Sequence, residues 1–169
     1  MKAENVERGG SRDDREDYLK MYQHLRTEAD TYHEAIWKLA FGTVVAAAAV
    51  ASFLFTHKTD GVISFGPRGL LALIGGLVFA IGVTGTALIH MYAVYYEVTR
   101  HIGNVYRNAW IRAETRGALA EKLTERYNAA LSAYRMNIIY TLRWTFPAMA
   151  VAAAGFIVAA FAFCRVLTR

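Results

Sequence analysis

Residues 69–94 read GLLALIGGLVFAIGVTGTALIHMYAV, a run without Asp, Glu, Lys or Arg that decides the fold class. An ionised side chain near the centre of a bilayer costs roughly 2.5–3.5 kcal/mol, and about 20 apolar residues cross the hydrocarbon as a helix. Two further runs, residues 39–56 and 144–164, also lack these four residue types. The sequence therefore predicts an all-α integral membrane protein, with three transmembrane helices and long cytoplasmic helical extensions.

The overall composition agrees with this prediction. Hydrophobic residues make up 55% of the 169-residue chain. A soluble bundle would have to cover three helices that are apolar on all sides, and the remaining chain is too short to do so. Residues 1–38, which precede the first run, are mostly polar, unlike the start of a cleavable signal peptide. We therefore expect all three runs to remain in the lipid bilayer.

Lysine and arginine define the expected topology. All but four of the 19 lie in residues 1–38 and 95–143, and such segments stay in the cytoplasm. The expected location is therefore the cell membrane, as a multi-pass protein with a cytoplasmic N terminus. Aromatic residues suited to a membrane interface mark the same side: Trp37, Tyr92, Tyr95, Tyr96, Tyr140 and Trp144.

Local signals place the segment boundaries. Ser11 is an expected helix N-cap, and Gly103 and Gly117 are expected weak points of the helix that returns to the cytoplasm. Pro147 falls in the leading turns of the third span, where its missing N–H is tolerated. The expected order is a disordered N terminus (1–10), a cytoplasmic helix (11–38), the first span (39–56), an outer loop (57–68), the second span (69–94), a cytoplasmic helical segment (95–143), the third span (144–164) and an outer tail (165–169).

Both cytoplasmic segments carry a less polar stripe at helical spacing, so we expect their helices to dock against each other. In the first segment the stripe consists of Tyr18, Tyr22, Leu25, Ala29, Tyr32 and Ile36. In the second it consists of Leu119, Leu123, Tyr127, Ala130 and Tyr134.

Small residues at small-xxx-small spacing are concentrated in the second span, and this spacing lets helix backbones approach closely in a membrane. Such faces can pack within one subunit or between subunits. Because the other two spans are also rich in small residues, we expect part of this packing to be self-association into a homo-oligomer. The expected helix-packing or oligomer-interface residues are Ala72, Gly75, Gly76, Ala80, Gly82, Gly85 and Thr86.

A polar line follows the same helix as it leaves the bilayer. His90, Glu97 and His101 fall on one helical face. Ionisable groups at membrane depth are typical of metal and proton sites. The alternative is that they face lipid headgroups or the N-terminal helix, and the sequence leaves the identity of any metal open.

Catalytic motifs are absent from the sequence. It contains no Gly-x-Ser-x-Gly elbow, no phosphate-binding loop, no Cys-x-x-Cys and no His-Glu-x-x-His. The lone Cys164 excludes an intramolecular disulfide. We therefore expect neither enzymatic activity nor a cofactor.

Residues 106–126 combine arginines and a lysine with Tyr106 and Trp110. Nucleic acid is one conceivable partner of such a stretch, but anionic lipid headgroups explain the basic residues more simply at a membrane surface. We therefore expect the lipid bilayer, further copies of the chain and a cytoplasmic protein as partners, and no nucleic acid.

The layout of Tyr18 to Leu123 resembles a known family. A tyrosine-containing cytoplasmic helix that begins Tyr18-Leu-Lys-Met-Tyr and leads to Trp37, two spans with a brief outer loop and a long returning helix are similar to bacterial SLATT-type small transmembrane effectors. This resemblance, which covers architecture and no specific motif, implies pore formation on activation by a partner sensor.

Two classes of function follow from the sequence. The first is a homo-oligomeric pore or channel-like effector with the second span along the axis. The second is a non-conducting structural or adaptor subunit of a membrane complex. The second class is favoured by the scarcity of polar side chains near the middle of the membrane, where the only ones are Thr43, Ser52, Thr84 and Thr86.

Overall fold

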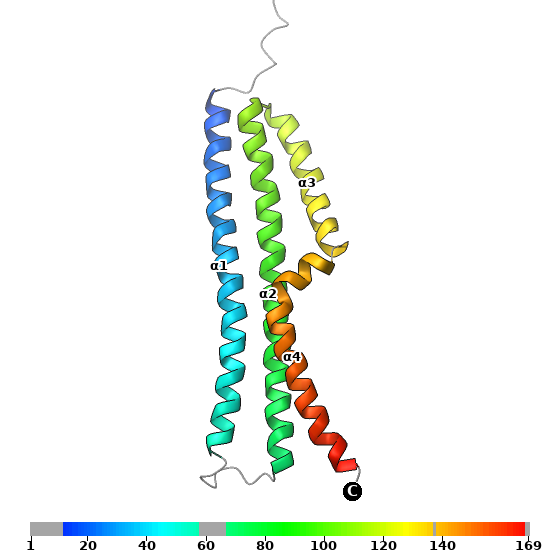
Figure 1. The fold of residues 1–169 in the computed structure, drawn as a ribbon. Coiled ribbons are helices and arrows are strands. Elements are labelled where there is room, and N and C mark those ends of the chain that lie inside the picture. Colours follow the sequence, from blue (N-terminus) through cyan, green and yellow to red (C-terminus); the bar gives the residue numbers. More distant parts are fainter. Residues whose placement is uncertain (1–11, 58–66, 137, 168–169) are drawn as a thin grey trace, which may run out of the picture. The chain divides into compact units, whose positions relative to one another are not determined.

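The computed structural model describes residues 12–57, 67–136 and 138–167. Within these ranges nearly all of the chain is helical, so the predicted all-α fold is confirmed. The predictions for residues 1–11, for the loop residues 58–66 and for residues 168–169 lie outside the described part. The described residues form four helices, α1 (Arg12–His57), α2 (Pro67–Arg112), α3 (Arg116–Met136) and α4 (Ile138–Leu167) (Figure 1).

The two longest helices each combine an apolar part with a polar part. α1 and α2 have 46 residues each, which corresponds to about 69 Å of helix at a rise of about 1.5 Å per residue. The hydrocarbon of a bilayer is only about 30 Å thick. Each helix is therefore long enough to cross a membrane and still extend well beyond it.

Of the described residues, three helical stretches are long and apolar enough to cross a membrane: Arg12–Thr56, Pro67–Arg112 and Leu142–Ala162. Asp13 and Asp14 occupy the first turn of α1, where the positive end of the helix dipole favours acidic residues. Pro67 opens α2, where a proline costs no hydrogen bond.

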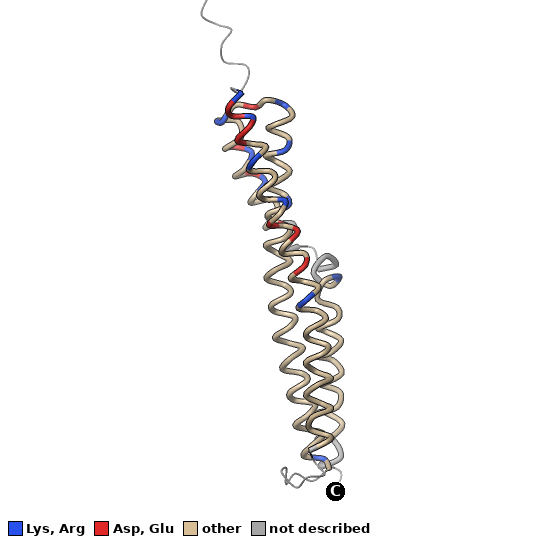
Figure 2. Tube along the Cα trace, turned by 90° about the vertical axis from the view of Figure 1, so that its left-hand side faces the viewer, with Lys and Arg blue, Asp and Glu red and all other residues tan. Residues whose placement is uncertain are grey.

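The chain divides into two compact units. Unit 1 comprises Met1–Ala35 and Tyr92–Tyr140, and unit 2 comprises Ile36–Met91 and Thr141–Arg169. Figure 2 shows that the charged residues gather on the helical parts assigned to unit 1, whereas the helices of unit 2 are largely free of them. The divisions fall near the span ends expected at residues 38, 94 and 143, which remain predictions.

Unit 1 has its core where α1, α2 and α3 meet. Tyr18, Val105, Ala109 and Leu119 are buried together, and Leu123 packs against them. The two predicted stripes therefore meet at Tyr18 and Leu119. Further along α3 the prediction is only partly right, because Ala130 is buried but the Tyr127 side chain is 46% exposed.

Unit 2 is held by an apolar cluster of Leu54, Leu70 and Ile74 between α1 and α2. Ile36 and Ile89 are also almost completely buried. Burial of aliphatic side chains on facing helices explains why these segments pair.

α2 and α3 are separated at residues 113–115 and not at either glycine that the sequence singled out. α2 runs without interruption through Gly103, and Gly117 lies in the first turn of α3. Ala113 adopts a left-handed conformation with φ of 52°, and the Glu114 N–H donates to the Ala109 carbonyl at 3.1 Å. This geometry is that of a Schellman motif, which ends a helix by bonding carbonyls that would otherwise lack a partner.

The expectation for Pro147 also needs correction. α4 begins at Ile138, so Pro147 lies inside the helix and not in its leading turns. Because proline has no N–H, the carbonyl of Arg143 loses its usual helix hydrogen bond.

Candidate functional site

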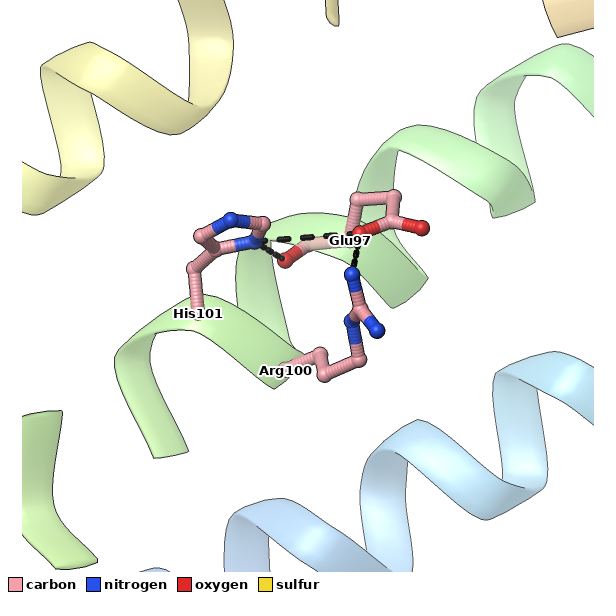
Figure 3. A network of polar contacts seen from close by, with 3 residues as sticks. All are labelled: Glu97, Arg100 and His101. Carbon is pink, nitrogen blue, oxygen red and sulfur yellow. Dashed lines mark hydrogen bonds and ion pairs between the residues drawn. The ribbon is translucent and has the colours of Figure 1, made fainter. Parts of the chain in front are cut away.

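A polar network lies on α2 within unit 1. Glu97 is only 8% exposed, and Arg100 Nη2 donates to Glu97 Oε2 at 2.9 Å. His101 Nδ1 lies 2.8 Å from the Glu97 carbonyl oxygen and 3.7 Å from Glu97 Oε2. Figure 3 shows both neighbours converging on Glu97. A largely buried carboxylate is thereby compensated by charge and hydrogen bonding, as burial requires.

The structure assembles part of the predicted polar line. Glu97 and His101 are in contact, whereas His90 is exposed on α2 and belongs to unit 2. Among the described residues there is no group of three or more His, Cys, Asp or Glu that could hold a metal ion. The closest partner of the Glu97 carboxylate is Arg100, which is not part of the predicted polar line.

Aromatic side chains of α1 and α2 stack on each other near this network. His33 of α1 stacks on Tyr96 with centroids 5.5 Å apart, and the Arg100 guanidinium lies 5.9 Å from the centre of the Tyr96 ring. Tyr32 stacks on Tyr95 at 5.8 Å. Stacking and cation–π contacts of this kind restrict the positions of the polar groups.

A groove between α1 and α2 adjoins the network in unit 1. Its volume is about 190 Å³. Two arginines line it from facing helices, Arg26 from α1 and Arg100 from α2. The other lining residues are Tyr22, Leu25, Ala29, Asp30, Tyr96, Thr99, Gly103 and Asn104.

Small residues line this groove on both helices. Ala29 and Gly103 line it from the two helices, and a Cβ added to Gly103 would meet Leu25 Cβ only at an ordinary 3.6 Å. Gly103, which the sequence predicts to be a weak point of the helix, instead lies within unbroken α2 and lines the groove.

Some of the predicted packing glycines bring helices of unit 2 into close contact. A Cβ added to Gly75 or Gly82 would come within 3.0 Å of α4 backbone atoms, at Ala159 and Ala152 respectively. A Cβ added to Gly85 would collide with the Thr43 side chain of α1. These three glycines therefore pack within one chain, which was one of the two predicted alternatives.

The remaining small residues of the prediction have different surroundings. Gly76 is exposed, with nothing within 4 Å of an added Cβ, and Ala80 is exposed as well. Ala72 is partly buried, and the Thr86 hydroxyl donates to the Gly82 carbonyl at 2.8 Å. Sequence spacing alone did not separate these residues from the glycines that pack within the chain.

The part of unit 1 where α2 is followed by α3 is held by ion pairs near a buried tyrosine. Arg116 Nε donates to Asp14 Oδ1 at 2.6 Å, and Lys122 Nζ donates to Glu114 Oε1 at 2.6 Å. The Tyr18 hydroxyl is buried and has no hydrogen-bond partner among the described residues. Burial, with a further contribution from Asp14, raises the pKa of Tyr18 above its ordinary value.

Comparison with family models, curated proteins and solved structures finds no match for this chain. The resemblance to SLATT-type effectors therefore remains a prediction from the sequence. The function has to be argued from the geometry of the two units.

Proposed function

We propose that this chain is a multi-pass integral membrane protein, with a cytoplasmic N terminus, that self-associates into a homo-oligomeric pore or channel-like assembly. The observation that carries this proposal is the exposed small-residue face of α2, Gly76-xxx-Ala80-xxx-Thr84. Helices in lipid associate mainly through close packing, and such faces permit it. Because Gly75, Gly82 and Gly85 already pack within the chain, this second face is available to another copy.

The surface of the apolar helices supports placement in a membrane. Only 22%, 28% and 22% of the most apolar windows of the three helices is buried within the chain. Phe41, Phe146 and Ile157 are 73%, 68% and 65% exposed. Contiguous apolar surface on this scale is unusual for a soluble monomer, and lipid or further subunits would cover it.

The polar groups in the spans determine what an assembly could conduct. Thr84 and Ser52 are exposed, so their hydroxyls can face a central path in an oligomer. The hydroxyls of Thr43 and Thr86 donate to backbone carbonyls one turn earlier, at 2.7 and 2.8 Å. A path formed in this way would be narrow and largely apolar, similar to a hydrophobic gate.

The scarcity of polar groups near the middle of the spans favours the second candidate, a non-conducting structural or adaptor subunit. Two of the four hydroxyls near the middle of the spans donate to backbone carbonyls, which leaves little polar lining. In this alternative the small-residue face packs without opening a path, and unit 1 recruits a cytoplasmic protein.

The test compares two matched substitutions in liposomes that contain the purified protein. Ala80→Leu adds bulk to the exposed face of α2, and Ala154→Leu adds the same bulk to an exposed alanine of α4. Ion or dye efflux and chemical crosslinking are measured in parallel. We expect Ala80→Leu to abolish both efflux and crosslinked oligomers, and Ala154→Leu to preserve both.

The two readouts separate the candidates. Crosslinked oligomers in liposomes that do not leak would favour the adaptor. Efflux that survives Ala80→Leu unchanged would contradict a pore built around this face of α2.

A further inference from the structure

The groove between Arg26 and Arg100 in unit 1 is lined by several charged and polar residues. Packing of apolar helices in a membrane does not require such residues. We propose that it binds a phosphate group, either of a small phosphorylated solute or of a lipid headgroup. The groove lies entirely within unit 1, so the proposal is independent of whether the chain oligomerises or conducts.

The arrangement of donors supports an oxyanion. Arg26 and Arg100 line the groove from different helices, and it is also lined by residues whose side chains carry hydroxyl or amide groups: Tyr22, Tyr96, Thr99 and Asn104. A phosphate presents oxygens on several sides, so it can accept from donors on both helices at once. Guanidinium–phosphate hydrogen bonds are also among the stronger hydrogen bonds in proteins.

The two arginines differ in how much of their charge is available. Arg100 is held through one terminal nitrogen by Glu97 at 2.9 Å, which leaves its other N–H groups for a ligand. No ion pair among the described residues includes Arg26, although Asp30 lies one turn away on the same helix. Glu97 therefore positions one arginine, and Arg26 supplies a positive charge that is not engaged in an ion pair with any described residue.

The dimensions of the groove restrict the ligand. Pockets for drug-sized ligands have volumes of about 300–1,000 Å³, whereas this groove has about 190 Å³. It therefore suits a phosphate with little else attached, or the phosphate end of a larger molecule whose remainder stays outside. Asp30 also lines the groove and opposes an anion, which provides a substitution with the opposite expected effect.

The experiment measures the thermal unfolding midpoint of the full chain in an uncharged detergent. Inorganic phosphate is titrated at constant ionic strength in one series, and phosphatidic acid in mixed micelles in another. A ligand that binds only the folded state raises the midpoint in a saturable way. We expect Arg26→Gln and Arg100→Gln to weaken this response about tenfold or more, because each removes charge-assisted hydrogen bonds.

Two controls test whether the response belongs to the groove. Arg107→Gln removes an exposed arginine of α2 that does not line the groove, and it should leave the response unchanged. Asp30→Asn should strengthen it severalfold, because it removes the opposing charge.

Each outcome has a definite meaning. A response to inorganic phosphate identifies a soluble ligand, and a response to phosphatidic acid alone identifies a lipid headgroup; both support a phosphate site. No saturable response in either series overturns the proposal. An equal response in the Arg26→Gln, Arg100→Gln and Arg107→Gln variants overturns it as well, because general charge screening would then explain the effect.

Discussion

Adjacent glycines of α2 provide a test of the packing in unit 2. Gly75 and Gly76 follow each other in one helix, so replacement of either by alanine gains the same helix propensity, about 1 kcal/mol. Their surroundings differ. A Cβ at Gly75 would lie 2.5 Å from the Ala159 backbone nitrogen and 2.8 Å from the Gly155 carbonyl oxygen, whereas a Cβ at Gly76 meets nothing within 4 Å.

The propensity gain cancels when the two variants are compared, so the difference between them measures the clash. The atoms near Gly75 belong to the backbone of α4, which has no flexible side chain to move aside, and overpacking of this kind costs about 1–3 kcal/mol. We therefore expect Gly75→Ala to be about 1–3 kcal/mol less stable than Gly76→Ala. Gly76→Ala itself should be as stable as the parent chain or more stable.

The assay is reversible unfolding in mixed micelles of a mild detergent and sodium dodecyl sulfate, followed by circular dichroism. Protein should be dilute enough to remain monomeric, so that self-association through Gly76 does not contribute. Equal stabilities of the two variants, or a less stable Gly76→Ala, would refute the close contact between α2 and α4.

Two further predictions concern unit 1. Ala113 has φ of 52°, a conformation that costs a non-glycine residue roughly 1–2 kcal/mol. Ala113→Gly should therefore raise the free energy of unfolding by up to about 1 kcal/mol. In the same denaturation assay, Ala120→Gly within α3 should lower it by about 1 kcal/mol, because glycine has a low helix propensity. The pKa of Tyr18 is higher in the folded state than the ordinary value of about 10.0, so folding favours the protonated hydroxyl. This contribution to stability is complete at pH values below the unfolded-state pKa and is lost as the pH rises through the folded-state pKa. Tyr18→Phe should therefore lose less stability between neutral pH and pH values above 10 than the parent chain does, whereas Tyr127→Phe, at an exposed position, should leave the alkaline profile unchanged. A Tyr18→Phe profile that coincides with that of the parent would contradict this assignment.

The helical class and the three apolar helices could be predicted because they depend on composition over long windows. The docking of the two less polar stripes was also predictable at Tyr18 and Leu119, where the 3.6-residue period places apolar residues on facing surfaces. The break after α2 was not predictable in this way. It occurs at Ala113, a residue with high helix propensity, and Gly103, which looked like a weak point, lies within an unbroken helix.

The candidate site was harder to predict, because it depends on which residues of different helices face each other. Glu97 and His101 are one turn apart on α2, so their contact follows from helical spacing alone. The groove requires Arg26 and Arg100, which are far apart in the sequence and meet only through the pairing of α1 with α2. A single sequence contains no signal for such a pair.

The small residues of α2 also show that sequence spacing does not determine which face of a helix meets a neighbouring helix. Successive residues of a helix are about 100° apart, so Gly75 and Gly82 share one face and Gly76 lies on another. The four-residue spacing predicts helix packing at Ala72, Gly76 and Ala80. The contact with α4 instead involves Gly75 and Gly82, which are seven residues apart. Once that pair and Gly85 are assigned to contacts within the chain, the face that includes Gly76 and Ala80 is left without a partner in the described structure. Self-association is inferred from this remaining face, and the number of small residues in the span is not by itself an argument for it.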